Sequence, residues 1–279
     1  MSGFEFIWVL FIIMALQPVV ARRALELMRQ NRIAQIERRR ESRVIVLIHR
    51  QETMSLLGFP LMRYIDMQDS EQVLRAIHMT DDNVPLDIVL HTPGGLVLAS
   101  VQIARAIRAH PAKVTVFVPH MAMSGGTLIA LAADEVVMCE HSVLGPVDPQ
   151  INQDPAVSII KAVEDKPIAE VDDKTLIRAD VARKAVAQLR ETVERILPEA
   201  MPDADRRRLI DALTSGKWTH DYPILAEDAK AIGIPVSTAM PEAVLDLMTM
   251  YPQPNRLQRT VEFSPGPREP KPQETGRIG

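Results

Sequence analysis

Residues 86–95, LDIVLHTPGG, and residues 113–139, KVTVFVPHMAMSGGTLIALAADEVVMC, share one pattern, in which a strand-like run ends in a glycine-containing turn. The apolar runs are rich in Val and Ile and too short for helices, which is typical of buried strands. Helical periodicity follows the first turn over residues 95–110, and the run TLIALAA follows the second. This alternation predicts parallel strands joined by crossover helices.

The same pattern extends outward in both directions. VIVLIH (44–49) and DEVVMC (134–139) predict two further strands, and residues 70–79 predict a helix between the first strands. The later chain is mainly helical, over residues 173–197, 203–214 and 225–232. We therefore expect one α/β domain over residues 44–251. The remaining segment, 252–279, holds six of the 21 prolines and is expected to be a disordered tail.

The N-terminal residues 4–21, FEFIWVLFIIMALQPVVA, form an apolar run with a single charge, Glu5. A helix of about 20 apolar residues can cross a bilayer, so residues 1–21 are predicted to be a transmembrane anchor. A signal peptide would have basic residues before its apolar run, and here the arginines follow it. The positive-inside rule then places the bulk of the chain in the cytoplasm. A core helix is the remaining alternative, and residues 22–43 read as a helical stalk or a solvated helix face.

The charge distribution separates these two parts. Residues 1–50 carry nine Arg and four Glu, whereas residues 51–279 are acidic with a net charge of −9. An acidic body argues against nucleic-acid binding. The single cysteine, Cys139, excludes a disulfide scaffold, and its place at the end of an apolar strand argues against a nucleophilic role. The histidines show no recognisable metal spacing and no nucleotide-binding glycine pattern occurs, so we expect no metal or cofactor.

The two turns carry the candidate chemistry. His91-Thr-Pro-Gly-Gly95 can aim free N–H groups at a ligand oxygen, although two glycines can equally make a simple tight turn. Ser124, in Ala122-Met-Ser-Gly-Gly126, precedes a helix whose N-terminus favours developing negative charge. This suits a serine nucleophile, whose attack on a carbonyl creates an oxyanion, but an N-cap serine is the ordinary alternative. In a parallel sheet both turns fall at the edge where ligands bind, which favours the catalytic interpretation.

The HTPGG motif, followed by MAMSGGTLIALAADEVVMCEHSVLGPVDPQ (121–150), resembles the Clp-protease/crotonase superfamily. More specifically, it is similar to signal-peptide-peptidase-A and NfeD-type serine peptidases and to the serine dehydrogenase proteinase family. The likeness covers about residues 43–254. It implies a ClpP/crotonase-like spiral of ββα units, peptide-bond hydrolysis and homo-oligomerisation. It also implies that Ser124 is the nucleophile, with an oxyanion hole formed by N–H groups of Gly95 or Leu96 and of Gly125.

The general base is less defined. Where the Clp-type histidine is expected the chain has Val147 and Asp148, and Gly216-Lys217-Trp218 stands at the expected aspartate. The related peptidases use a lysine about 40 residues after the serine, and the likeness of SIIKAVEDK (158–166) favours Lys166. A lysine base requires burial, which lowers its pKa. The alternatives are Lys161, Lys174, Lys184 or no catalytic lysine. His141 and His220 are expected to be structural, and His220 can also orient substrate or pair internally.

These observations predict a membrane-anchored, cytoplasm-facing serine peptidase with a Ser124–Lys166 dyad, acting on polypeptides that include membrane-protein segments. Two rivals remain. The missing triad motivates a non-catalytic scaffold of the same fold, and the shared oxyanion-hole architecture motivates a crotonase-like acyl-CoA enzyme.

Overall fold

The computed structural model describes residues 3–50, 63–199 and 201–251. The predicted tail lies outside them. The elements, in chain order, are α1 (Gly3–Arg40), β1 (Arg43–Ile48), α2 (Met67–His78), β2 (Leu86–His91), α3 (Val97–Ala109), β3 (Val114–Val118), β4 (Met121–Ala122), α4 (Gly125–Leu131), β5 (Glu135–Met138), β6 (Val143–Leu144), β7 (Gln150–Ile151), β8 (Asp154–Pro155), α5 (Ala156–Glu164), the 3-10 helix η1 (Ile168–Glu170), α6 (Asp173–Ile196), α7 (Asp203–Thr214), β9 (Ile224–Leu225), α8 (Ala226–Ala231), β10 (Val236–Ser237) and α9 (Glu242–Thr249).

A five-stranded sheet in the order β1-β2-β3-β5-β10 forms the centre of the domain, and all of its pairings are parallel. The four strands predicted from short apolar runs are β1, β2, β3 and β5, so this part of the prediction is confirmed. Crossover helices connect them, as the alternation of patterns requires. The mixed α/β architecture with a parallel sheet fits the expected ClpP-like fold.

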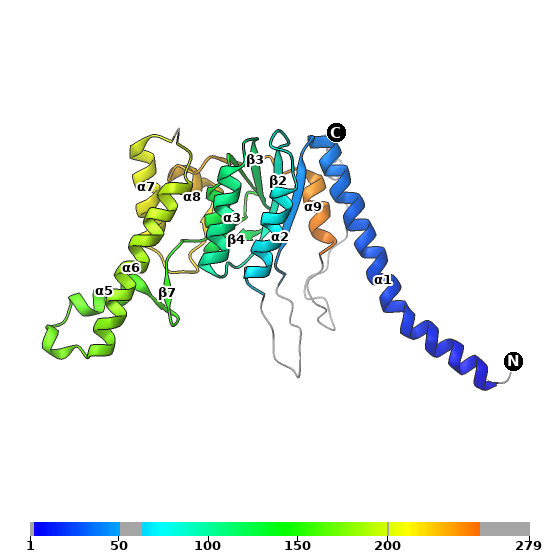
Figure 1. Cartoon of the computed structure of the whole chain (residues 1–279), viewed down its shortest axis with the longest axis horizontal. Helices are drawn as coiled ribbons and strands as arrows, with labels where there is room; N and C mark the ends of the chain where they lie inside the picture. The colour runs from blue at the N-terminus through cyan, green and yellow to red at the C-terminus, as the bar shows by residue number, and fades with distance from the viewer. Residues whose placement is uncertain (1–2, 51–62, 200, 252–279) are drawn as a thin grey trace, which may run out of the picture.

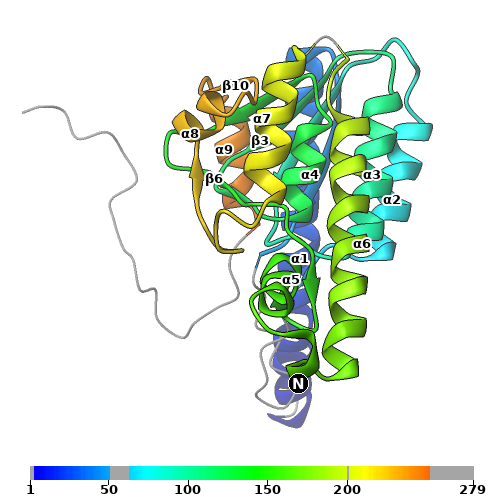
Figure 2. The ribbon, with the colours of Figure 1, turned by 90° about the vertical axis from the view of Figure 1, so that its left-hand side faces the viewer.

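The two faces of the sheet pack against different helices. On one face, residues such as Ile88 and Val116 join the large core beneath α2, α3 and α4. On the other face, the paired residues Val89, Phe117 and Val137 pack against α9 and the end of α1. Figures 1 and 2 show α2 and α3 side by side on one side of the sheet and α9 on the other. Alternation along each strand thus sends neighbouring side chains into separate cores.

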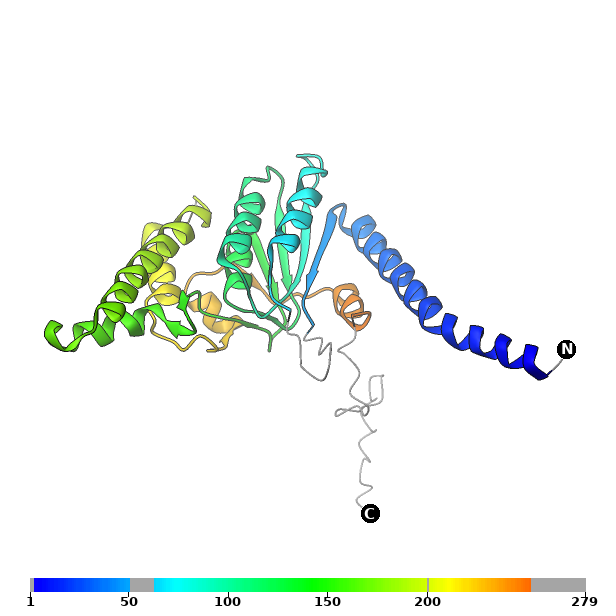
Figure 3. The same ribbon diagram turned by 60° about the horizontal axis from the view of Figure 1, so that its bottom comes forward.

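Helix α1 spans both the predicted anchor and the predicted stalk, which form one continuous helix. Its last turns dock on the domain, where Ile36 is buried and Arg40 pairs with the buried carboxylate of Asp87 at 2.5 Å. Its N-terminal end points away from the body (Figure 3). Within the side chains that the structure describes, no helix is long and apolar enough to span a membrane. Most side chains of residues 4–21 lie outside that part, so the anchor stays a prediction.

Two smaller structures surround the main sheet. A three-stranded sheet, β4-β6-β9, extends from the second glycine-containing turn. Helices α5 and α6 pack together around a separate small core of residues such as Ile159 and Ala182. Their hairpin projects from the body at the side opposite α1 (Figure 1). The two-residue strands were not predicted, because strands this short carry no periodicity to detect. Helix α5 was not predicted either.

Candidate active site

The two glycine-containing turns lie against each other. Thr92 forms a parallel bridge with Ala122, in which Thr92 N donates to Met121 O at 3.1 Å and Met123 N donates to Thr92 O at 3.0 Å. Gly94 has a φ of 104° and approaches so closely that a β-carbon there would lie 3.1 Å from Ser124 Cβ. The expectation that both turns meet at one edge of the sheet is therefore confirmed.

Ser124 adopts a backbone conformation that is rare for a residue with a side chain. Its φ is 49° and its ψ is −112°, and it directly precedes α4. Its side chain makes no capping hydrogen bond, so Ser124 is not an ordinary N-cap. Such backbone strain costs on the order of 1–3 kcal/mol and is typical of functional sites. The half-buried hydroxyl is left available for chemistry.

Two backbone N–H groups beside Ser124 are free to bind an oxyanion. Among the backbone hydrogen bonds of the described residues, neither Gly95 nor Gly125 donates its N–H. A β-carbon on Gly125 would lie 3.7 Å from Gly95 N, so the two groups are close neighbours. The other predicted donor is wrong: Leu96 N donates to Ile65 O at 2.8 Å and is therefore occupied. The arrangement leaves a pair of donors, Gly95 and Gly125.

A cavity of about 440 Å³ opens beside Ser124 and Gly125. Apolar side chains form most of its wall, among them Val97, Leu98, Val101, Leu128, Val147 and Leu189. Such a pocket suits an apolar group of a bound ligand. Val147, close to where a Clp-type histidine is expected, lines this cavity and carries no titratable group.

Asp148 also reaches this cavity, and it is paired with His220. The carboxylate is 4% exposed, accepts from His220 Nδ1 at 2.5 Å and is bonded by the Gln150 amide. This hydrogen bond raises the pKa of His220 against the opposing effect of burial. His220 therefore pairs internally, one of the two roles considered for it. Its partner lies 72 residues away, a distance over which the sequence gives no signal.

The predicted base is not near Ser124 in this chain. Lys166 is exposed in the turn between α5 and η1, on the projecting hairpin. The alternatives Lys161, Lys174 and Lys184 are exposed as well, and Lys184 pairs with Asp180. None of the four lines the Ser124 cavity. Lys166 as base stays a prediction.

The remaining nucleophile candidate is poorly suited to the role. Cys139 is half-buried directly after β5, and burial raises the pKa of its thiol. A raised pKa keeps the thiol protonated and unreactive. His141 is exposed two residues further on, outside the Ser124 cavity.

The chain is similar in sequence to a known protein family and to two known proteins. The sequence profile of a family described as ClpP-like SDH-type serine proteinase matches residues 1–277. Two uncharacterized proteins of Methanocaldococcus jannaschii are 49% identical over 260 residues, covering 93% of this chain and 91% of the relative, and 46% identical over 274 residues, covering 98% and 92%.

Solved structures of one protease also resemble the chain. A mutant of the 1510-N membrane-bound stomatin-specific protease has a TM-score of 0.45 and 20% identity, covering 66% of this chain and 79% of that one. A second mutant, in complex with a substrate peptide, has a TM-score of 0.44 and 21% identity, covering 66% and 74%.

Proposed function

The chain belongs to the ClpP-like SDH-type serine proteinase family, and from this premise we propose that it hydrolyses peptide bonds with Ser124 as the nucleophile. The observation that carries the assignment is the placement of Ser124, whose strained backbone holds it beside the free N–H groups of Gly95 and Gly125. A serine peptidase needs a serine hydroxyl beside N–H groups that can bind an oxyanion, and Ser124 lies in such a position.

The reaction follows from this placement. Ser124 Oγ attacks the scissile carbonyl carbon while its proton passes to a base, and the carbonyl oxygen becomes an oxyanion held by Gly95 N–H and Gly125 N–H. The tetrahedral intermediate collapses, the C–N bond breaks, and the base returns the proton to the leaving amine. Water then attacks the acyl-enzyme by the same route and releases the second product.

We propose Lys166 as the base within an assembly that buries it and brings it to Ser124 Oγ of a neighbouring copy, because Lys166 lies outside the Ser124 cavity of its own chain. A lysine serves as a base only when it is neutral, which requires removal from water. The hairpin that carries Lys166 also exposes large apolar side chains, since Ile168 is 75% and Ile177 66% exposed. Exposed apolar surface of this kind favours contact with another copy of the chain. A homo-oligomer formed through this hairpin would cover Lys166.

A fluorophosphonate probe, which reacts with activated serines, tests this assignment. We expect labelling of the wild type at Ser124, and a rate lowered about 10²–10⁴-fold in Lys166→Ala because general base assistance is lost. Lys161→Ala is the matched control, since this exposed lysine lies on the same hairpin, and it should label like the wild type. Equal labelling of both variants would remove Lys166 from the mechanism. Absence of labelling in the wild type would favour the scaffold.

We further propose that residues 4–21 anchor the protein in a membrane with the peptidase domain on the cytoplasmic side, where segments of membrane proteins are candidate substrates. The apolar run and the arginines that follow it support this. After alkaline carbonate extraction, we expect the full chain to stay in the membrane fraction and a variant without residues 1–21 to be released. Release of both forms would contradict the anchor.

A further inference from the structure

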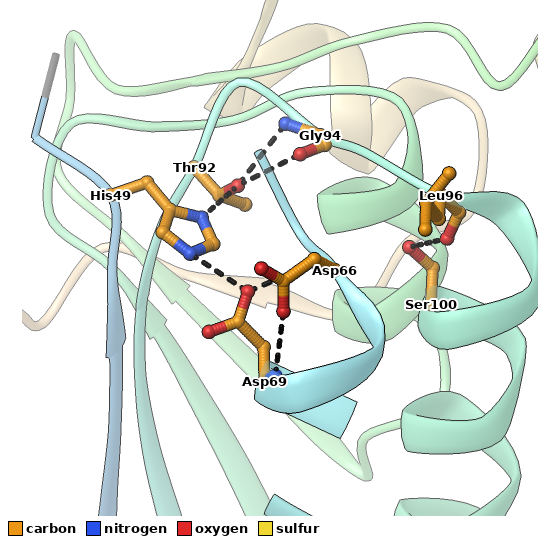
Figure 4. Close-up of polar contacts among 7 residues, drawn as sticks. All are labelled: His49, Asp66, Asp69, Thr92, Gly94, Leu96 and Ser100. Carbon is orange, nitrogen blue, oxygen red and sulfur yellow. Dashed lines mark hydrogen bonds and ion pairs between the residues drawn. The ribbon is translucent and has the colours of Figure 1, made fainter. Parts of the chain in front are cut away.

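The hydroxyl of Thr92 lies inside the turn that presents Gly95. Thr92 is fully buried, and its Oγ1 accepts a hydrogen bond from Gly94 N at 3.1 Å and lies 3.3 Å from Gly94 O. The same oxygen is 2.9 Å from His49 Nδ1 (Figure 4). Thr92 Oγ1 therefore contacts both peptide groups of Gly94, because Gly94 N belongs to the Pro93–Gly94 peptide and Gly94 O to the Gly94–Gly95 peptide that carries the Gly95 N–H.

His49 connects Thr92 to a fixed carboxylate. His49 directly follows β1 in the chain, and its imidazole is almost fully buried. The ring nitrogen Nε2 lies 3.1 Å from Asp69 Oδ2. Asp69 is held in turn by the capping box of α2, because its Oδ2 accepts from Asp66 N at 3.0 Å and its own N–H donates to Asp66 Oδ1 at 2.9 Å. The chain of contacts thus runs from a rigid helix start to the catalytic turn.

The chemistry of the groups assigns a direction to each hydrogen bond. An ionised carboxylate only accepts, so the proton of neutral His49 belongs on Nε2 and Nδ1 carries the lone pair. The Thr92 hydroxyl then donates to His49 Nδ1, which leaves its oxygen to accept from Gly94 N–H. The series Gly94 N–H to Thr92, Thr92 O–H to His49 and His49 Nε2–H to Asp69 satisfies every donor and acceptor in turn.

We propose that Asp69 and His49 are positioning residues for the oxyanion turn, residues 92–95, in which neutral His49 draws the Thr92 hydroxyl hydrogen away from Gly94 O and protonation of His49 turns that hydrogen onto Gly94 O. The proposal deepens the function proposed above and rests on it, since the turn matters only if Gly95 binds the oxyanion of a Ser124 reaction.

Protonation of His49 reverses one bond in the series. Protonated imidazole carries N–H on both nitrogens, so Nδ1 becomes a donor toward Thr92 Oγ1. The hydroxyl hydrogen must then leave His49 and turn to Gly94 O, which already accepts from Ile65 N at 2.8 Å. A cavity of about 700 Å³ is lined by His49, Asp69 and Gly95, and Ser124 is not among its lining residues.

The surroundings favour the neutral ring. Burial is the largest effect on His49 and lowers its pKa, and Arg63 lowers it further. Asp69 and Asp66, at the start of α2, oppose this and raise it. On β2, burial lowers the pKa of His91 to about 4, with smaller contributions from the charges of Arg50, His120 and His49, so His91 is neutral at neutral pH. Neutral His49, which accepts the hydrogen of the Thr92 hydroxyl, is therefore the form present at neutral pH. It is lost when the pH falls below the usual pKa range of histidine.

Peptide hydrolysis by the full chain, followed as a function of pH, tests the series. Thr92→Val keeps the shape but removes the hydroxyl, and should lower kcat about 10–100-fold with little change in KM, because a misplaced donor weakens transition-state binding. Thr92→Ser should restore most of kcat. In Asp69→Asn the amide oxygen still accepts from Nε2, but the charge that raises the pKa of His49 is gone. The pH at which the His49 imidazole takes up its second proton, followed by ¹⁵N NMR, should therefore move to lower values, and this readout is independent of the protonation of the general base.

The proposal is overturned if Thr92→Val and Thr92→Ser have equal kcat, or if the pH at which His49 becomes protonated does not fall in Asp69→Asn. A second readout does not depend on activity: ¹⁵N NMR of the imidazole should show a protonated Nε2 and an unprotonated Nδ1 in His49 at neutral pH. The opposite tautomer would also overturn it. Ser124→Ala distinguishes failure of the proposed peptidase function from failure of the positioning role. If Ser124→Ala still hydrolyses peptides, the proposed function itself is wrong. If Ser124→Ala is inactive but Thr92→Val has the wild-type kcat, only the positioning role is wrong.

Discussion

Ser124→Ala is expected to abolish peptide hydrolysis, with kcat lower by roughly 10⁴–10⁶-fold, and to leave the domain as stable as the wild type. The large loss follows because alanine has no hydroxyl to form the acyl-enzyme, and the neighbouring hydroxyl of Ser100, next to Gly125, is buried and donates to Leu96 O at 3.1 Å. The unchanged stability follows because the Ser124 hydroxyl makes no capping bond. Alanine also keeps the β-carbon, so the strain of φ 49° remains the same in both proteins.

Two measurements on the same preparations check this result. Hydrolysis of an unstructured polypeptide gives kcat, and thermal unfolding followed by circular dichroism gives Tm. Ser158→Ala is the matched control, because this serine is exposed on α5 and should leave both quantities unchanged. A purified Ser124→Ala protein that still hydrolyses the substrate at the wild-type rate would show that another residue is the nucleophile.

The juxtaposition of the two turns was predictable from sequence because it follows from topology. Parallel strands present their carboxyl ends at one edge, so HTPGG and AMSGG had to meet once the strands were assigned. The backbone of Ser124 was not predictable, because a serine before a helix is most often an N-cap and only the structure shows φ 49° without a capping bond.

Long-range contacts account for what the sequence could not predict. The sequence does not distinguish Gly95 from Leu96 as the donor to the oxyanion. In the structure the N–H of Leu96 donates to Ile65 O and is occupied. Ile65 comes from about 30 residues earlier and pairs with Gly95 through an isolated bridge, which leaves no periodic signal. The same holds for Asp148 with His220 and for Thr92 with His49, whose side chains are joined only by the fold. Local patterns locate the two glycine-containing turns, whereas the groups that hold them are set by tertiary structure.

Gly95→Ala is expected to lower kcat about 10²–10³-fold and to destabilise the domain by about 2–4 kcal/mol, a larger cost than the usual glycine substitution. A β-carbon at this position would lie 2.3 Å from both Ile65 N and Ile65 O. The bridge must therefore open, which disturbs the bonds from Ile65 N to Gly94 O and from Leu96 N to Ile65 O, each 2.8 Å long. Because Gly95 N–H moves with the bridge, the oxyanion loses a correctly placed donor.

Gly233→Ala separates this clash from the general cost of replacing a glycine. Gly233 has a φ of 101°, and a β-carbon there would meet nothing closer than Asp205 Cβ at 3.6 Å. This control should lose only about 1 kcal/mol from its left-handed backbone and keep the wild-type kcat, because it lies in the turn before β10, outside the cavity beside Ser124. Urea unfolding and steady-state kinetics on both variants give the comparison. If Gly95→Ala behaved like Gly233→Ala in both measurements, the close approach of Gly95 to Ile65 would not be what positions the oxyanion donor.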